Sequence, residues 1–278
     1  MKFLRLLAVT GIALFLFACN SGQNQLTVIN SESFHEKQVR LDSTVQSRLL
    51  VDSMMPEQNP EVQDQPALSG KLDALAELAD KVKQTKSDSL WSRLKTEWEG
   101  FRMKFAGKDG IFADQNQVAN DSLARSKSKM LAQKWANLNK NLLQFSGEGM
   151  FGDAIEQLLY NSESPVLTDK FLKSIVFTHI FDQIFVNILA SSSVEHYHTT
   201  GGAIKLIQET NYPESNKMTL TSKCSDVRYL DVFIRIPSWA VNPSVQLGNV
   251  KYVCHPGEYC QISRKWNDGD KIDVLLKN

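Results

Sequence analysis

Apolar residues recur every three or four positions over a long central part of the chain. The first such series consists of Leu72, Leu75, Ala76, Ala79 and Val82. This spacing places all five side chains on one side of an α-helix. It therefore predicts an amphipathic helix that begins close to Lys71.

A second series is aromatic and consists of Trp91, Leu94, Trp98, Phe101 and Phe105. The predicted helix starts at the polar run 87–89 and ends before two glycines, at 107 and 110. Exposed aromatic side chains at such spacing could stack on sugars. The alternation of three and four residues favours packing against another helix.

Helical spacing continues up to about residue 174. A third helix is predicted over 130–145, a short fourth over 151–159, and one more over 167–174. Beyond this point the pattern alternates between apolar and polar residues. It predicts short strands at 181–189, 203–209, 218–222, 229–236, 244–247, 259–263 and 271–276. Seven strands with turn signals about ten residues apart are typical of an antiparallel sandwich.

The first residues have the pattern of an export signal. Lys2 and Arg5 precede an apolar stretch, and a small residue, Ala18, stands before Cys19. The run 16–19 is similar to the bacterial lipobox, whose cysteine is acylated and becomes the first mature residue. We therefore expect lipidation at Cys19, although a plain cleaved signal with a chance cysteine is the alternative. Acyl chains would hold the protein at a membrane.

The predicted fold class is α+β, with helices first and an antiparallel β-sandwich last. The polar, proline-containing residues after Cys19 show no period and indicate a tether. We predict a signal peptide over 1–18, a flexible tether over 19–70, a helical segment over 71–173 and a sandwich over 174–278.

Composition and charge limit the function classes. The 278 residues are 42% hydrophobic, which excludes a wholly disordered chain, and 31 basic side chains balance 31 acidic ones. Removal of residues 1–18 takes away Lys2 and Arg5 and leaves a formal charge of −2. Nothing in this balance predicts nucleic acid as a partner. A complete helical toroid or a (β/α)8 barrel, typically about 250 residues, would leave no room for the other segments.

Three cysteines remain if Cys19 is lipidated. Cys224, Cys254 and Cys260 allow one disulfide and one free thiol. Three pairings are possible, and the sequence does not choose between them.

Several motifs of the predicted sandwich resemble glycoside hydrolase family 127, the β-L-arabinofuranosidases. They are 208–213 (QETNYP), 233–240 (FIRIPSWA), 257–259 (GEY), 264–266 (RKW) and 269–270 (GD). Residues 135–161 are similar to the late helical hairpin of the family's (α/α)6 barrel, and 39–48 weakly to its first strand. The resemblance covers about 128–278 and implies a sandwich joined to a partial α/α barrel.

The family resemblance implies a zinc-bound cysteine nucleophile and a glutamate general acid. Zinc lowers the pKa of a thiol, so that a thiolate exists at neutral pH. The alignment places the family's Glu-x-Cys pair near Ser128 and Met130, and its Cys-Cys pair near Glu163 and Ser164. All four ligand positions are thus lost, and no counterpart of the acid glutamate aligns. We therefore expect no catalytic residue, no cofactor and no metal site.

Histidines near the start of the predicted sandwich offer two alternative candidate sites. His196 and His198 would point the same way from a strand and, with Glu195, could hold a metal, but ordinary polar edge residues are the simpler interpretation. His179 is expected to be a half-buried histidine whose polar atoms are satisfied, with pairing to Asp182 as an alternative.

Carboxylates and tryptophans offer two further candidates. Asp153 and Glu156 lie three apart on one helix, which favours a solvated helix surface over a glycosidase pair, since such a pair flanks the bond at about 5–9 Å. Trp239 and Trp266 might stack on sugars, although packing at the edge of the sandwich is the default.

The expected function is an accessory role in glycan use. We predict a catalytically degenerate envelope lipoprotein that is an accessory carbohydrate-binding or assembly component, with an oligosaccharide of plant or host origin as its ligand. It is expected to face the periplasm, because no acidic cluster follows Cys19. The alternatives are an active glycosidase with a different carboxylate pair, a protein that binds another protein and no sugar, and a gene remnant with an internal deletion.

Overall fold

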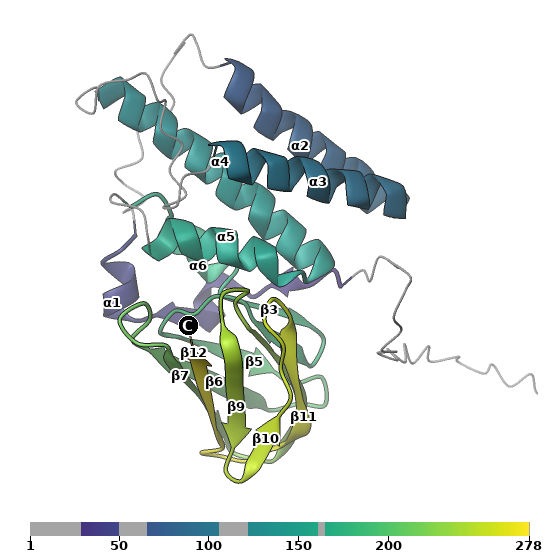
Figure 1. Ribbon diagram of the computed structural model, residues 1–278. Coiled ribbons are helices and arrows are strands. Elements are labelled where there is room, and N and C mark those ends of the chain that lie inside the picture. Colours follow the sequence, from purple (N-terminus) through teal and green to yellow (C-terminus); the bar gives the residue numbers. More distant parts are fainter. Residues whose placement is uncertain (1–28, 50–65, 106–121, 161–164, 278) are drawn as a thin grey trace, which may run out of the picture.

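The computed structural model describes residues 29–49, 66–105, 122–160 and 165–277. Helices form one end of the molecule and two β-sheets form the other (Figure 1). The fold class predicted from the sequence, α+β with a sandwich, is confirmed. Within the described residues, no helix is long and apolar enough to cross a bilayer.

The aromatic stripe predicted on the second helix lies inside the helical layer. This layer consists of α2 (Pro66–Thr85), α3 (Asp88–Phe105) and α4 (Ser122–Ser146). Trp98 of α3 stacks on Trp135 of α4 with ring centroids 5.2 Å apart, and its indole nitrogen donates to Asn139 Oδ1 at 2.9 Å. The stripe is therefore helix packing, because Trp98 is almost fully buried.

The sandwich consists of a five-stranded and a seven-stranded sheet. The strand order is β1-β3-β4-β8-β11 in the first sheet and β10-β9-β12-β7-β6-β5-β2 in the second. Neighbouring strands are antiparallel except for β4 and β8. The bounds are β3 (Phe177–Ile180), β4 (Gln183–Val186), β5 (Ser192–Tyr197), β6 (Ala203–Thr210), β7 (Lys217–Cys224), β8 (Arg228–Arg235), β9 (Val241–Leu247), β10 (Val250–Tyr252), β11 (Tyr259–Trp266) and β12 (Lys271–Lys277).

The predicted strand over 181–189 is wrong in its bounds. The chain forms a hairpin there, with β3 before the turn and β4 after it, and Phe181 lies in the turn with a φ of 50°. A strand cannot continue through a left-handed residue. The apolar run continues through the turn without a Gly or Pro, so the sequence contains no signal that predicts the turn.

The prediction of a tether over 19–70 does not hold for residues 29–49. This stretch forms β1 (Glu32–Ser33), a 3-10 turn over Glu36–Gln38, β2 (Val39–Leu41) and α1 (Ser43–Gln46). β1 pairs with β3, and β2 pairs with β5. Five apolar side chains within this polar stretch are buried, and their burial supplies the driving force for folding it onto the sandwich: Phe34, Val39, Leu41, Val45 and Leu49.

The last two helices lie between the helical layer and the sandwich (Figure 1). They are α5 (Gly149–Tyr160) and the short α6 (Asp169–Lys173). α5 approaches the sandwich so closely that a Cβ atom on Gly149 would lie 2.5 Å from the carbonyl oxygen of Gly257. This close approach places the polar face of α5 directly against the end of β8.

Candidate functional site

A buried arginine joins α5 to the sandwich. Arg235 is the last residue of β8, and its side chain is 1% exposed. Its guanidinium forms ion pairs with Asp153 and Glu156, both from α5. Its Nε donates to the carbonyl oxygen of Asn187.

The two carboxylates are fixed by further donors. The backbone N–H of Ser238 donates to Asp153 Oδ2 at 3.1 Å, and that of Leu189 donates to Glu156 Oε1 at 2.7 Å. Burial raises the pKa of Glu156 above its ordinary value, although the charge and hydrogen bonds of Arg235 oppose this shift. Burial also raises the pKa of Tyr259, whose hydroxyl donates to Asn187 Oδ1.

The expectation that Asp153 and Glu156 lie on a solvated helix surface is wrong. Glu156 is 3% exposed, and both carboxylates are held by one guanidinium. A buried charge requires a partner, and Arg235 supplies it. Both acids lie on α5 and bind the same guanidinium, which is the geometry of a structural junction and not that of two acids on opposite sides of a glycosidic bond.

A cleft opens beside this junction, and we call it the α1 cleft. It has a volume of about 510 Å³ and is lined by Thr44, Val45, Ser47, Arg48, Tyr160, Ser191, Thr210, Asn211, Tyr212 and Glu214. These residues come from α1, the end of α5, the start of β5 and the connection between β6 and β7. Concave sites of this size are typical of small-ligand binding.

Aromatic rings form one wall of the α1 cleft. The rings of Tyr160 and Tyr212 meet edge to face with centroids 4.9 Å apart. Trp239 stacks on Tyr212 at 5.7 Å and supports it from outside the cleft. Burial raises the pKa of Tyr212 to about 12, so its hydroxyl stays protonated near neutral pH.

An ion pair bounds the same cleft. Arg48 Nη2 lies 3.0 Å from Glu214 Oε1, and the Arg48 guanidinium lies 5.4 Å from the centre of the Tyr160 ring. Both charged side chains are partly exposed. Their polar atoms are therefore available to a ligand as well as to each other.

The histidines near Glu195 contact an aspartate. His196 Nε2 lies 2.8 Å from Asp182 Oδ1, and His198 Nε2 lies 3.4 Å from Asp182 Oδ2. Burial disfavours the charged form of Asp182, but hydrogen bonds from Thr199 and His196 outweigh it and hold the pKa of Asp182 below its ordinary value. Asp182 therefore pairs with His196, which lies on β5, and with His198, which directly follows β5.

His179 is half-buried, as predicted, and its ring is tilted against that of Phe34, with ring centroids 4.5 Å apart. The expectation that its polar atoms are satisfied fails at Nδ1, which is buried and has no hydrogen-bond partner among the described residues. Burial, followed by the charge of His196, lowers the pKa of His179. Among the described residues, no group of three His, Cys, Asp or Glu side chains is arranged to hold a metal ion.

The residues aligned with the family's zinc ligands do not fit a zinc ion. Ser128 and Met130 lie on α4, neither is a ligand type that zinc prefers, and Met130 is 48% exposed. Glu163 and Ser164 lie outside the described residues, as do Cys19 and the signal segment. The one free cysteine of the described chain, Cys224, lies on β7, and burial and nearby Asp268 and Asp270 raise its thiol pKa.

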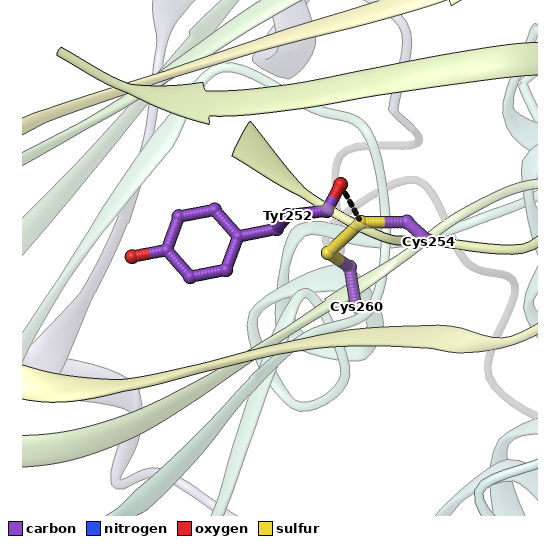
Figure 2. Close-up of a disulfide and its surroundings, with 3 residues drawn as sticks. All are labelled: Tyr252, Cys254 and Cys260. Atoms are coloured by element: carbon purple, nitrogen blue, oxygen red, sulfur yellow. Dashed lines mark hydrogen bonds between the residues drawn. A yellow bond between two sulfur atoms is a disulfide. The ribbon is translucent and has the colours of Figure 1, made fainter. Parts of the chain in front are cut away.

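The other two cysteines form a disulfide. Cys254 and Cys260 have Cα atoms 5.0 Å apart and link the loop after β10 to β11. Figure 2 shows the Cys254 sulfur next to the carbonyl oxygen of Tyr252, at 3.5 Å. One of the three pairings left open by the sequence is thereby selected.

The two candidate tryptophans differ in position. Trp266 is fully buried, and its indole nitrogen donates to the carbonyl oxygen of Leu230 at 3.1 Å, so it is a core residue. Trp239 is half-buried behind Tyr212. Stacking of a sugar on Trp266 is thus excluded by its burial.

Sequence reasoning missed Arg235, Arg48 and the two tyrosines of the α1 cleft. A signal for Arg235 was present, since a lone arginine stands in the apolar run 232–236 and a charge in a core strand requires a partner. The other three come together only when α1 packs beside the end of α5. No short motif links positions so far apart.

Comparison with known proteins relates the sandwich to one family of glycosidases. Residues 183–277 match the family model described as Beta-L-arabinofuranosidase, GH127 middle domain. This match covers about a third of the chain and spans β4 to β12. Among curated proteins, none matches the chain.

Solved structures of the same class share the fold. A GH127 β-L-arabinofuranosidase from Geobacillus stearothermophilus T6 has a TM-score of 0.56 at 16% identity, covering 74% of this chain and 41% of its own. A GH127 β-arabinofuranosidase gives 0.57 at 19%, covering 74% and 42%, and a protein described as a glycoside hydrolase gives 0.59 at 15%, covering 84% and 51%. The chain thus spans about two fifths to one half of the length of these proteins. Its fold is that of a GH127-type sandwich capped by helices.

Proposed function

We propose that this protein is a lipid-anchored envelope protein, related to GH127 glycoside hydrolases and catalytically degenerate, which binds carbohydrate in an accessory role. Its sandwich matches the GH127 middle domain, and its fold is similar to that of solved GH127 structures. Its ligand would be an arabinofuranoside or a related oligosaccharide of plant or host origin.

The fixed pairing of Asp153 and Glu156 with Arg235 is the observation that best supports the proposed loss of catalytic activity. These acids are engaged in holding α5 on the sandwich, so neither is positioned to protonate a leaving sugar oxygen. The positions aligned with the zinc ligands carry Ser128, Met130, Glu163 and Ser164. The chemistry of the family therefore has no thiolate to use at these positions.

The proposal of a lipid anchor is supported by the sequence of the first nineteen residues, in which Cys19 would be the acylated residue. The Cys254–Cys260 disulfide supports export, because such bonds persist in oxidising compartments. We place the protein on the periplasmic face. Loss of fatty-acid labelling and release from the membrane fraction in a Cys19→Ala variant tests the anchor, and retention of both in that variant contradicts it.

One paired experiment tests the binding role. The purified soluble chain, without residues 1–19, is screened for hydrolysis and for binding on one panel of arabinose-containing and other plant oligosaccharides, with zinc supplied. We expect binding without turnover. Turnover that is lost on substitution of one of the protein's own carboxylates would overturn the proposal, and so would the absence of binding to every glycan, the result expected of a protein-binding lipoprotein.

A further inference from the structure

We propose that the α1 cleft is the carbohydrate-binding site and that it takes a short, neutral oligosaccharide. The inference rests on the proposed function, because it names the site at which the proposed binding occurs. The α1 cleft adjoins a second cleft on the surface of the seven-stranded sheet. The second has a volume of about 430 Å³ and shares Thr44, Ser191, Thr210 and Asn211 with the α1 cleft.

The combined groove is lined largely by side chains that carry hydroxyl, amide or charged groups. Its second half is lined by Arg40, Asp42, Ser192, Ser193, Gln208 and Glu209, among others. A sugar chain presents hydroxyls that both donate and accept hydrogen bonds. The exposed donors and acceptors of the groove, on Arg40, Glu209 and Asn211, can therefore form hydrogen bonds with it.

The aromatic wall supplies the apolar contact that sugars require. One face of a sugar ring carries several C–H groups, and it packs against the π-surface of an aromatic side chain. Tyr160 and Tyr212 lie in the first half of the groove, where Arg48 and Glu214 stand beside them. The aromatic rings would contact the C–H face of a sugar ring, and the charged pair would bind its hydroxyl groups. The two contacts together would fix the orientation of the sugar.

The wall is held in place before any ligand arrives. Tyr160 donates its hydroxyl to the carbonyl oxygen of Leu189, and Tyr212 lies flat against Trp239. Asp42 accepts from the backbone N–H of Thr44 at 2.8 Å and so fixes the start of α1. Groups that are already ordered lose little conformational entropy on binding.

The charges of the groove favour a neutral ligand. The positive side chains are Arg40 and Arg48, and the negative ones are Asp42, Glu209 and Glu214. Arg48 is already paired with Glu214, and the one remaining cation, Arg40, is outnumbered by Asp42 and Glu209. A sugar with a carboxylate or phosphate would meet more negative than positive charge.

The test uses two arginines with similar surroundings. Arg264 lies at the opposite end of β11 from Tyr259. It pairs with Asp270 at 3.2 Å and lies 5.8 Å from the centre of the Trp266 ring, much as Arg48 lies between Glu214 and Tyr160. Arg48→Ala removes a groove contact, and Arg264→Ala removes an equivalent ion pair elsewhere. Asn211→Ala, at an exposed position, is a second groove variant.

Affinity for the tightest neutral oligosaccharide of the panel is measured by titration calorimetry for each variant. We expect Arg48→Ala and Asn211→Ala each to weaken binding by about tenfold, and Arg264→Ala to leave it within about twofold of the wild type. Galacturonate oligomers of equal length should bind more weakly than the neutral ones.

The possible failures are distinguishable. Wild-type protein that binds no glycan overturns the proposed function and the cleft together. Wild-type binding that both groove variants retain overturns the cleft alone and leaves the accessory role standing. Tighter binding of galacturonate oligomers overturns the neutral ligand class.

Discussion

Arg235 is the residue on which the contact between α5 and the sandwich depends most. Its guanidinium is buried between two carboxylates of α5, and its Nε is bound to Asn187. Removal of one partner from a buried charge cluster leaves uncompensated charge in the interior.

We predict that Arg235→Ala lowers the free energy of unfolding by about 3–5 kcal/mol, because it leaves Asp153 and Glu156 without their cation. Urea unfolding followed by fluorescence measures the change. The control is Arg264→Ala, whose partly exposed pair should contribute at most about 1 kcal/mol. Equal losses in the two variants would show that the junction is not a buried charge cluster in solution.

His179 predicts a dependence of stability on pH. Burial and the charge of His196 lower its pKa in the folded state, so the unfolded chain binds a proton more readily. The stabilisation is complete above 6.5, the ordinary pKa of a histidine, and is lost as the pH falls from there through the lower pKa of the folded state. Glu32, whose charge raises the pKa, opposes this effect, and His35 adds to it.

We therefore expect wild-type stability to fall between pH 7 and pH 5 by more than that of a His179→Phe variant, which keeps the ring beside Phe34. Thermal unfolding at a series of pH values measures the difference. Parallel pH profiles for the two proteins would contradict the role of His179.

At the scale of elements, the contact of α5 with the loop before β11 depends on a missing side chain. A Cβ atom on Gly149 would lie 2.5 Å from a backbone oxygen, and a backbone atom cannot turn aside as a side chain can. Gly100 in α3 has no atom within 4 Å of the corresponding position. The two glycines thus test packing and helix propensity separately.

We predict that Gly149→Ala destabilises the protein by about 1–3 kcal/mol through overpacking. Gly100→Ala should stabilise it by about 0.5–1 kcal/mol, because alanine is the better helix former. Urea midpoints of the two variants give both values. An unchanged free energy of unfolding in Gly149→Ala would mean that α5 packs less closely against the loop before β11 than the structure shows.

Most elements could be predicted from periodicity, because long helices and the later strands show one clear period each. The helix over Asp88–Phe105 and the strand Ala203–Thr210 are examples. The strands β1, β2 and β10 are two or three residues long, which is too short for a period to appear. β1 and β2 form by pairing with the distant strands β3 and β5, whereas β10 forms a short hairpin with β9.

The candidate site was less predictable for a related reason. Tyr160 and Tyr212 are 52 positions apart, and Arg48 is farther still from both. Only the fold brings them to one cleft. The spacing of Asp153 and Glu156 predicts only that they share one helix face, and it favours a solvated surface. Their burial depends on Arg235, which comes from another part of the chain.

At the scale of the whole molecule, one continuous buried cluster includes residues of the helices and of both sheets. Trp91 of α3, Phe151 of α5 and Ile234 of β8 all belong to it. The helical faces in the described part of the chain are thus covered, which opposes the interpretation of the chain as a remnant with unpartnered helices.

We predict that helices and sandwich unfold in one cooperative transition. Far-ultraviolet circular dichroism at 222 nm follows the helices, and near-ultraviolet signals follow the packed aromatic side chains. Coincident curves and equal calorimetric and van't Hoff enthalpies are expected. Two separate transitions would show that the junction at Arg235 does not couple the two parts.

The segment 29–41 supplies an edge strand to each sheet, β1 to one and β2 to the other. It also joins the helical layer, because the backbone N–H of Ile29 donates to the carbonyl oxygen of Phe145 at 3.0 Å. For a protein tethered at its N-terminus, a mechanical load would arrive at these few hydrogen bonds before any others of the described fold. The force that the molecule withstands would then be set by the hydrogen bonds of residues 29–41 and not by the stability of the sandwich core.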